Sequence, residues 1–183
     1  THIPFVTIDG ENSKDFDDAV YAEVNKKKIK ILVAIADVSF FVKKGDPIDL
    51  EARKRGNSFY FPDRVIPMLP EILSNNICSL IPNQIRASLV CEIILQNTKI
   101  VKYKFHRAKI LSKARLTYKE VDEIHKNNSK NEISKLVDNL FKALETLKKI
   151  SERRGKIEFK VKEYEVNFTN DKEFKFEEKE NYR

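Results

Sequence analysis

Four aspartates crowd into ten residues near the start of the chain. Asp9, Asp15, Asp17 and Asp18 lie in the segment TIDGENSKDFDDAV, which covers residues 7–20. Two like charges about 4 Å apart repel by roughly 4 kcal/mol at an effective dielectric constant of 20, so this segment needs a cation nearby. Oxygen ligands without His or Cys are typical of Mg²⁺ or Mn²⁺ sites. The segment therefore predicts a connection between two strand ends that turns several carboxylates toward one metal site.

Adjacent carboxylates suit a site for two ions. Asp17 and Asp18 point to opposite faces of an extended backbone, so each can serve one ion while Asp9 and Asp15 complete the ligand shells. Two ions about 3.5 to 4 Å apart stabilise both the attacking and the leaving oxygen of a phosphodiester displacement. The pattern makes these four aspartates candidate metal ligands and candidate catalytic residues of a nuclease.

There are two other interpretations of the aspartate segment, and its residues contradict the calcium-binding one. A calcium-binding EF-hand loop that begins at Asp9 needs Gly at its sixth position and Glu at its twelfth, but Lys14 and Val20 stand there. A solvated acidic turn binds no metal, and it is the more common explanation of an arbitrary Asp-rich turn. Phe16 lies among the aspartates and Ile8 precedes them. These apolar neighbours indicate partial burial and weigh against the solvated turn.

The apolar pattern predicts an α+β fold, with a mixed and largely antiparallel sheet packed by helices. Strands are expected at residues 5–9, 18–24, 29–37, 87–97, 99–110 and 157–168, the last with a bulge near residues 162–163. Residues 57–69 contain several prolines and are expected to run as an extended loop or edge strand. The aspartate segment is expected at the edge of the sheet, facing a basic groove.

Capping residues predict where the shorter helices begin and end. Asp46 is a candidate N-cap with Pro47 at the first helical position, and Gly56 is the C-terminal stop. Thr117 and Glu120 have the spacing of a capping box, which predicts a second short helix after residue 117.

A longer amphipathic helix is predicted from the apolar positions of residues 133–147. The polar residues 125–132 before it lack an apolar anchor and predict a variable loop. Residues 169–183 form a charged tail with no predicted terminating element. We find no internal repeat, and the length favours one domain over two.

The charge balance favours a polyanionic partner. The formal net charge is +7 and the isoelectric point is near 9.2, and basic proteins gain affinity for phosphate backbones by releasing counterions. A merely solvated lysine-rich surface explains the charge equally well.

No apolar run approaches the about 18 to 20 residues of a membrane span, so we expect no membrane partner and a cytoplasmic location. Cys78 and Cys91 lack zinc-site spacing and are expected to be reduced core residues.

Several motifs together resemble the RNB catalytic domain of the ribonuclease II and ribonuclease R family, nearest to the bacterial ribonuclease R type. They are the aspartate segment, VAIADVS (residues 33–39), ARKRGNSFYFPDRVIPMLPEILSNNICSL (residues 52–80) and ARLTY (residues 114–118). The motifs are long, ordered and correctly spaced from His2 to Leu116, and the resemblance extends onward through SERRGKIEF (residues 151–159). The resemblance is therefore specific.

The resemblance implies a processive 3′→5′ exoribonuclease that degrades single-stranded RNA to nucleoside 5′-monophosphates with Mg²⁺. It makes Asp9, Asp15, Asp17 and Asp18 the motif aspartates. It also implies that Tyr60 stacks on the 3′-terminal base, a contact that tolerates any base. Alternation along an extended segment agrees with this role, because it places the two neighbouring Phe rings on the opposite, core-facing side. Without the resemblance, the residues alone favour the alternative that all three rings belong to the core.

Basic residues flank Tyr60 on both sides. Arg53, Arg55 and Arg64 are candidates to line a phosphate path, although an ordinary solvated surface explains them equally well. Asp37 follows a buried strand and is expected to support the fold or the metal ligands rather than to bind metal itself.

The resemblance also implies parts that do not occur in this sequence. They are a further helical half of the catalytic domain, which supplies an arginine and a glutamate to the active site, and cold-shock and S1-type RNA-binding domains. Residues 1–183 are thus expected to be the N-terminal portion of an RNB catalytic domain. The alternative function is an RNA-binding fragment whose metal site is catalytically incomplete, and release of 5′-mononucleotides distinguishes the two.

Overall fold

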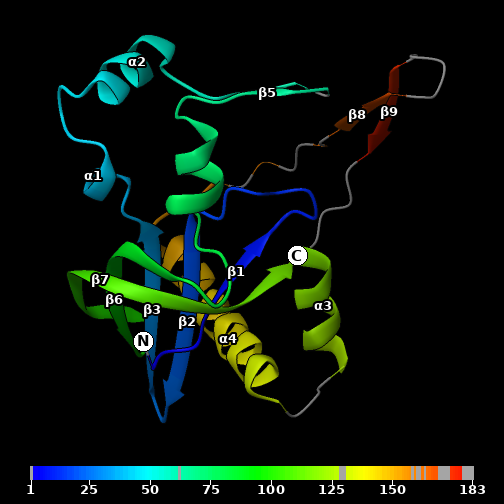
Figure 1. Cartoon of the computed structure of the whole chain (residues 1–183). Helices are drawn as coiled ribbons and strands as arrows, with labels where there is room; N and C mark the ends of the chain where they lie inside the picture. Colours follow the sequence, from blue (N-terminus) through cyan, green and yellow to red (C-terminus); the bar gives the residue numbers. More distant parts are fainter. Residues whose placement is uncertain are drawn as a thin grey trace.

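The computed structural model describes residues 2–61, 63–127, 131–157, 159, 162, 164–168 and 174–178. Within them, β1, β2, β3, β6 and β7 form a closed barrel in that order (Figure 1). The strands are Phe5–Asp9 (β1), Asp18–Asn25 (β2), Lys28–Ala36 (β3), Ile85–Gln96 (β6) and Lys99–Thr117 (β7). Neighbouring strands are antiparallel except β1 and β7, which run parallel. The predicted α+β fold with a mixed, largely antiparallel sheet is confirmed.

Closure of the barrel was not predicted. The last third of β7 pairs with β1, from Phe5 opposite Ser112 to Asp9 opposite Thr117. This parallel partner comes from the start of the chain, which explains why local alternation predicted that the strand ends at residue 110. A closed barrel removes the sheet edges along these pairs. The aspartate segment therefore lies at one end of the barrel, between the end of β1 and the start of β2, and not at a sheet edge.

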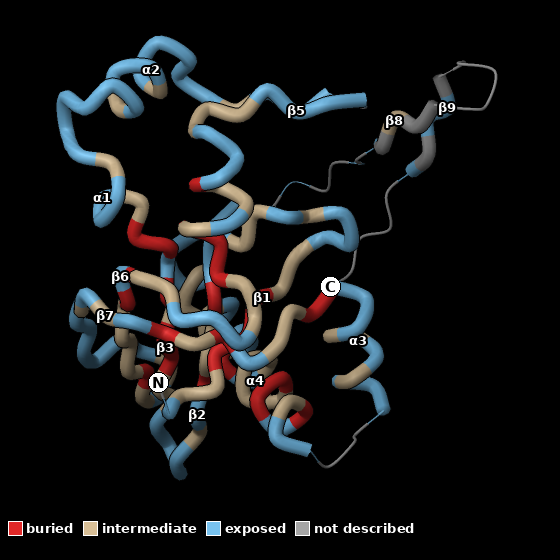
Figure 2. The backbone as a smooth tube through the Cα atoms, in the orientation of Figure 1, coloured by how far each residue is buried: buried red, intermediate tan, exposed pale blue. Residues whose placement is uncertain are grey.

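Buried residues lie mainly on the barrel strands and α4 (Figure 2), and the two faces of the strands contribute to different clusters. Phe5 and Val6 are adjacent and point to opposite faces. Phe5 belongs to a cluster with Leu32, Val90 and Ile110 from β3, β6 and β7, whereas Val6 belongs to a second cluster with residues of α4. The amphipathic helix α4 (Glu132–Arg153) thus covers one outer side of the barrel, as predicted.

The helix at residues 47–55 has the predicted boundaries, but its predicted N-cap residue makes no side-chain hydrogen bond to the helix. In α2 (Pro47–Arg55), Gly56 ends the helix at φ 73°, but the Asp46 side chain accepts a hydrogen bond from the Lys43 amide instead of capping the helix. The amide of Gly45 instead donates to Asp49. The short helices α1 (Val38–Phe41) and η1 (Leu73–Ile77), the latter with π-type hydrogen bonds, connect the barrel strands.

The predicted capping box opens α3 (Tyr118–Asn127). The Thr117 amide donates to Glu120 at 2.7 Å, and the Glu120 amide donates to the Thr117 hydroxyl at 3.1 Å. The predicted loop at residues 125–132 is shorter than expected, because α3 continues through Asn127 and α4 begins at Glu132. Asn131 caps α4 by accepting from the Ser134 amide.

Two small sheets lie apart from the barrel. β4 (Phe59–Tyr60) pairs with β5 (Val65–Ile66), and β8 (Tyr164–Phe168) pairs with β9 (Phe174–Glu178). The strand predicted at residues 157–168 is confirmed only from residue 164 onward. The bulge predicted near residues 162–163 stays a prediction, because residue 163 lies outside the described residues. Part of the predicted charged tail forms β9, while residues 169–173 and 179–183 are also outside them. None of the described helices is long and apolar enough to cross a membrane.

Candidate metal centre

The structure brings the four predicted aspartates to one end of the barrel. Asp9 is the last residue of β1 and Asp18 is the first of β2, and the two strands pair side by side. Asp15 and Asp17 lie in the connection between them. Burial raises the pKa of Asp9 from 3.8 to about 6, and the charge of Asp18 adds to this effect. The charges of Asp15 and Asp17 act on Asp9 in the same direction, so all four carboxylates share one electrostatic environment.

Asp17 experiences the same environment. Its burial raises its pKa, and the neighbouring charges of Asp15 and Asp18 raise it further. A raised pKa means that the ionised carboxylate is disfavoured at this place in the fold. Groups perturbed by burial together with specific charged neighbours are typical of functional sites.

The donor set fits a hard divalent ion. One carboxylate oxygen of Asp9, Oδ2, is buried and has no hydrogen-bond partner among the described residues, so its lone pairs are available to a cation. In the described part of the chain, no group of three or more His, Cys, Asp or Glu side chains is arranged to hold a metal ion. Like charges oppose such convergence in a metal-free protein. The two-ion arrangement therefore stays a prediction.

The backbone of the aspartate segment is fixed by buried partners. The Ser79 hydroxyl accepts from the Phe16 amide at 2.9 Å and donates to the Lys14 carbonyl at 3.1 Å. The Leu80 amide donates to the Phe16 carbonyl, and the Ala36 amide donates to the Asp17 carbonyl, each at 2.8 Å. Peptide groups on both sides of Asp15 and Asp17 are thus held by the barrel and by the segment after η1.

Arg115 holds the first part of the aspartate segment. Its guanidinium donates to the carbonyls of Gly10 and Glu11, at 2.5 and 2.8 Å, and lies 5.7 Å from the Phe16 ring centre. Its charge lowers the pKa of Asp9, which opposes the effect of burial. Arg115 lies in the motif ARLTY (residues 114–118), but the sequence alone did not predict a role for it. The available signal was a lone Arg between apolar residues of a strand.

Tyr60 lies beside the aspartates. Its hydroxyl donates to Asp15 Oδ2 at 3.0 Å, and this bond is the largest of the effects that raise the pKa of Tyr60. The ring is 68% exposed, so one of its faces is available to a ligand. The core-facing position expected for Phe59 and Phe61 is wrong, because both residues are exposed, Phe59 on β4 and Phe61 directly after it.

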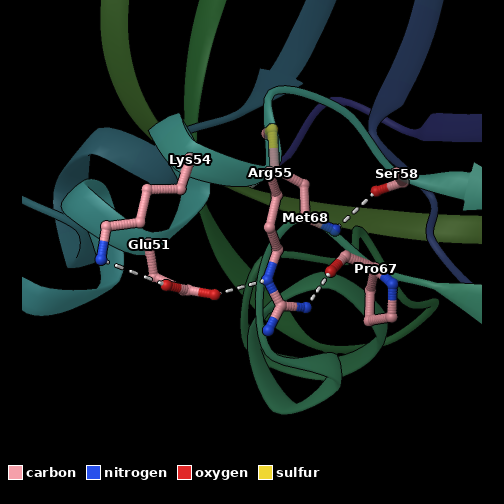
Figure 3. Close-up of polar contacts among 6 residues, drawn as sticks. All are labelled: Glu51, Lys54, Arg55, Ser58, Pro67 and Met68. Atoms are coloured by element: carbon pink, nitrogen blue, oxygen red, sulfur yellow. Dashed lines mark hydrogen bonds and ion pairs between the residues drawn. The ribbon is translucent and has the colours of Figure 1, made fainter.

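The base of the Tyr60 segment is tied to α2 (Figure 3). Arg55 donates to the Pro67 carbonyl at 2.8 Å and pairs with Glu51 at 3.0 Å, while the Met68 amide donates to the Ser58 hydroxyl. The two ends of the segment at residues 58–68 are thus held close to each other. Arg55 positions the segment and has local partners.

The other two candidate arginines also have local partners. Arg53 pairs with Asp49 at 3.0 Å, and Arg64 pairs with Asp63 at 2.8 Å while lying 5.2 Å from the Phe61 ring centre. Among the described residues, neither arginine contacts the four motif aspartates, and their role in a phosphate path stays a prediction.

Asp37 supports the fold. It is buried, accepts from the Ser39 hydroxyl at 2.6 Å and pairs with Arg107 at 3.3 Å. These bonds tie α1 to β7.

Both free cysteines agree with the expected reduced state: Cys78 is buried and Cys91 is partly buried.

Fold and site together define a barrel protein with a cluster of carboxylates at one barrel end. The chain belongs to the RNB domain family, which matches residues 1–183. It is 45% identical over 173 residues to ribonuclease R of Vibrio cholerae, and 45% identical over 178 residues to ribonuclease R of Escherichia coli. Each match covers 91% of this chain, and the chain spans about a fifth of these relatives, 21% of their length.

Solved structures share the fold. Mycoplasma genitalium RNase R in complex with ribose-methylated single-stranded RNA has a TM-score of 0.88 at 36% identity, over 100% of this chain and 29% of that one. Yeast Ssd1, described as a pseudonuclease, has a TM-score of 0.65 at 19% identity, over 82% of this chain and 17% of that one. Because the Ssd1 likeness extends to the fold alone, catalysis has to be argued from the site.

Proposed function

We propose that this chain forms the metal-binding part of a 3′→5′ exoribonuclease that hydrolyses single-stranded RNA processively to nucleoside 5′-monophosphates. The observation that carries the proposal is the carboxylate cluster: four motif aspartates share one barrel end, and one buried oxygen of Asp9 lacks a hydrogen-bond partner among the described residues. The RNB match and the RNase R relatives support it. Mg²⁺ is the proposed cofactor, with Mn²⁺ as a substitute.

The aspartates and Tyr60 have different proposed roles, which follow from their positions. Asp9, Asp15, Asp17 and Asp18 hold the metal, which when bound supplies positive charge to the phosphate oxygens and lowers the pKa of an attacking water. The exposed Tyr60 ring stacks on the terminal base beside them. The proposed partners are single-stranded RNA and the remainder of the parent enzyme, namely the second half of the catalytic domain and the cold-shock and S1-type domains. The cytoplasmic location stays a prediction.

The test follows the labelled ends of an RNA. With Mg²⁺, the full-length protein should release a 3′-terminal label as a 5′-mononucleotide at once, whereas a 5′-terminal label should pass from full-length RNA to a short end product without accumulating in RNA of intermediate length. An excess of unlabelled RNA added after the start should leave a processive reaction unaffected. Release of the 5′-terminal label first would contradict the proposed direction.

The second candidate is an RNA-binding fragment that is catalytically incomplete. It is favoured by the absence of a metal-holding group of three side chains among the described residues, and by the chain's share of about 21% of its relatives. The same labelled RNA separates the candidates when residues 1–183 are tested beside the full-length protein. Binding without product identifies the incomplete fragment.

Tyr60 offers a test that separates base stacking from support of Asp15. Tyr60→Phe keeps the ring but removes the hydrogen bond to Asp15, and we expect about a fivefold lower cleavage rate with an unchanged final product length, because one such bond is worth about 1 kcal/mol. Tyr60→Ala also removes stacking worth about 1 to 3 kcal/mol per base, so the final product should become longer. Cleavage assays with product sizing measure both.

The matched control for Tyr60 is Phe61→Ala, which removes the exposed ring of the next residue along the chain. It should leave the product length unchanged. Equal lengthening in Phe61→Ala would show that the whole segment, and not the Tyr60 ring, holds the terminal nucleotides.

A further inference from the structure

Ser79 occupies a special place next to the aspartate segment. The residue has 0% exposure, and its hydroxyl lies between two backbone groups that flank Asp15. It accepts from the Phe16 amide and donates to the Lys14 carbonyl. A single side-chain oxygen therefore bridges the peptide groups before and after Asp15, and it restricts the backbone of Asp15.

The chemistry requires a hydroxyl at this position. Only a group that donates and accepts at the same time can satisfy both the Lys14 carbonyl and the Phe16 amide. Ser79 is itself held in place, because Arg86 Nε donates to the Ser79 carbonyl at 2.9 Å and the neighbouring Leu80 amide binds the Phe16 carbonyl. The hydroxyl is thus fixed in position, and its two hydrogen bonds hold the backbone of the aspartate segment in place.

The segment needs such an anchor because its side chains repel each other. Asp17 has a raised pKa caused by burial and by the charges of Asp15 and Asp18. Without backbone anchors, this repulsion would be relieved by moving the carboxylates apart, and a bound cation would have to bring them together again. Partners that orient metal ligands commonly control metal affinity as strongly as some ligands do.

We propose that Ser79 is a positioning residue of the metal centre, which holds the backbone around Asp15 so that Asp15 and Asp17 are ready to bind a divalent ion. The inference deepens the proposed function and rests on its metal site. Ser79 does not contact the metal or RNA in this role. It acts through the Lys14 carbonyl and the Phe16 amide.

The experiment compares Ser79→Ala with a matched control in the full-length protein. Ser88 is also buried, at 1% exposure, but its hydroxyl has no hydrogen-bond partner among the described residues. Ser88→Ala therefore removes the same atom from another buried serine, on β6, without removing an anchor. Mn²⁺ affinity is measured by calorimetry, amide hydrogen exchange is followed at Phe16, and RNA affinity is measured without metal.

Ser79→Ala should weaken Mn²⁺ binding by about tenfold or more, the usual effect of losing a partner that orients metal ligands. It should also speed hydrogen exchange at the Phe16 amide while leaving metal-free RNA affinity unchanged. Ser88→Ala should match the wild type in all three measurements. Ser79→Thr retains the hydroxyl and should restore Mn²⁺ affinity, which a purely space-filling role of Ser79 would not explain.

Two outcomes would count against the inference in different ways. Faster exchange at Phe16 with wild-type Mn²⁺ affinity would show that Ser79 anchors the backbone without positioning the metal ligands, and the proposed metal site would stand. No Mn²⁺ binding by the wild-type protein would remove the metal site itself, and with it both proposals.

Discussion

Asp17→Asn is expected to lower RNA hydrolysis by the full-length protein by about a thousandfold or more, while single-stranded RNA stays bound. Asn preserves the shape of the side chain but removes the charge that organises a metal ion. The Asp17 backbone should stay in place, because the Ala36 amide binds its carbonyl at 2.8 Å. Mononucleotide release and RNA affinity measure the two effects separately.

The same substitution should make the metal-free protein more stable. Burial and the charges of Asp15 and Asp18 raise the pKa of Asp17, so ionisation of Asp17 costs more in the folded protein than in the unfolded chain. Asn carries no charge and removes this unfavourable interaction. The melting temperature without metal should therefore rise, a result typical of a functional site that is not optimised for stability.

Asp63→Asn provides the control for loss of one negative charge. Asp63 is exposed and pairs with Arg64 at 2.8 Å, an interaction whose loss changes stability by about 1 kcal/mol at most. It should leave hydrolysis unchanged. Retained hydrolysis in Asp17→Asn would exclude Asp17 from the catalytic set, and a lower metal-free melting temperature would favour a structural acidic turn.

Local sequence signals predicted the elements that depend on neighbouring residues. The capping box of Thr117 and Glu120 is confirmed by both of its hydrogen bonds, and the first strand is confirmed at residues 5–9. The local partners of Arg53 and Arg55 were also available to sequence reasoning, because Asp49 and Glu51 precede them by four residues.

Long-range contacts limited what the sequence could predict. Barrel closure joins β1 to the end of β7, and the anchors of the aspartate segment lie far along the chain, at Ser79 and Arg115. No periodicity relates such residues. Sequence motifs located the carboxylates, but the groups that hold them follow from the three-dimensional structure.

The pH dependence of stability tests the environment of Asp9. Its pKa is about 6 in the folded protein and 3.8 ordinarily, so between about pH 4 and pH 6 the folded state binds more protons than the unfolded state. Stability must then fall as pH rises through this window, because ionisation of Asp9 is easier in the unfolded chain. Allowing for the solvent that reaches this partly exposed group, the fall should be about 1 to 2 kcal/mol without metal.

Asp9→Asn should flatten the fall in stability between pH 4 and pH 6, and the slope that remains should come from Asp17, whose pKa is also raised. Denaturant unfolding at several pH values measures the slope, with Asp63→Asn as the variant that should keep it. Saturating Mg²⁺ should abolish the fall, because a bound cation favours the ionised carboxylates. Below pH 6, protons and metal compete for Asp9, so Mg²⁺ affinity should drop by up to about tenfold per pH unit for each proton displaced. Stability that rises with pH through this window would show that Asp9 is not held in the unfavourable environment on which its role as a metal ligand depends.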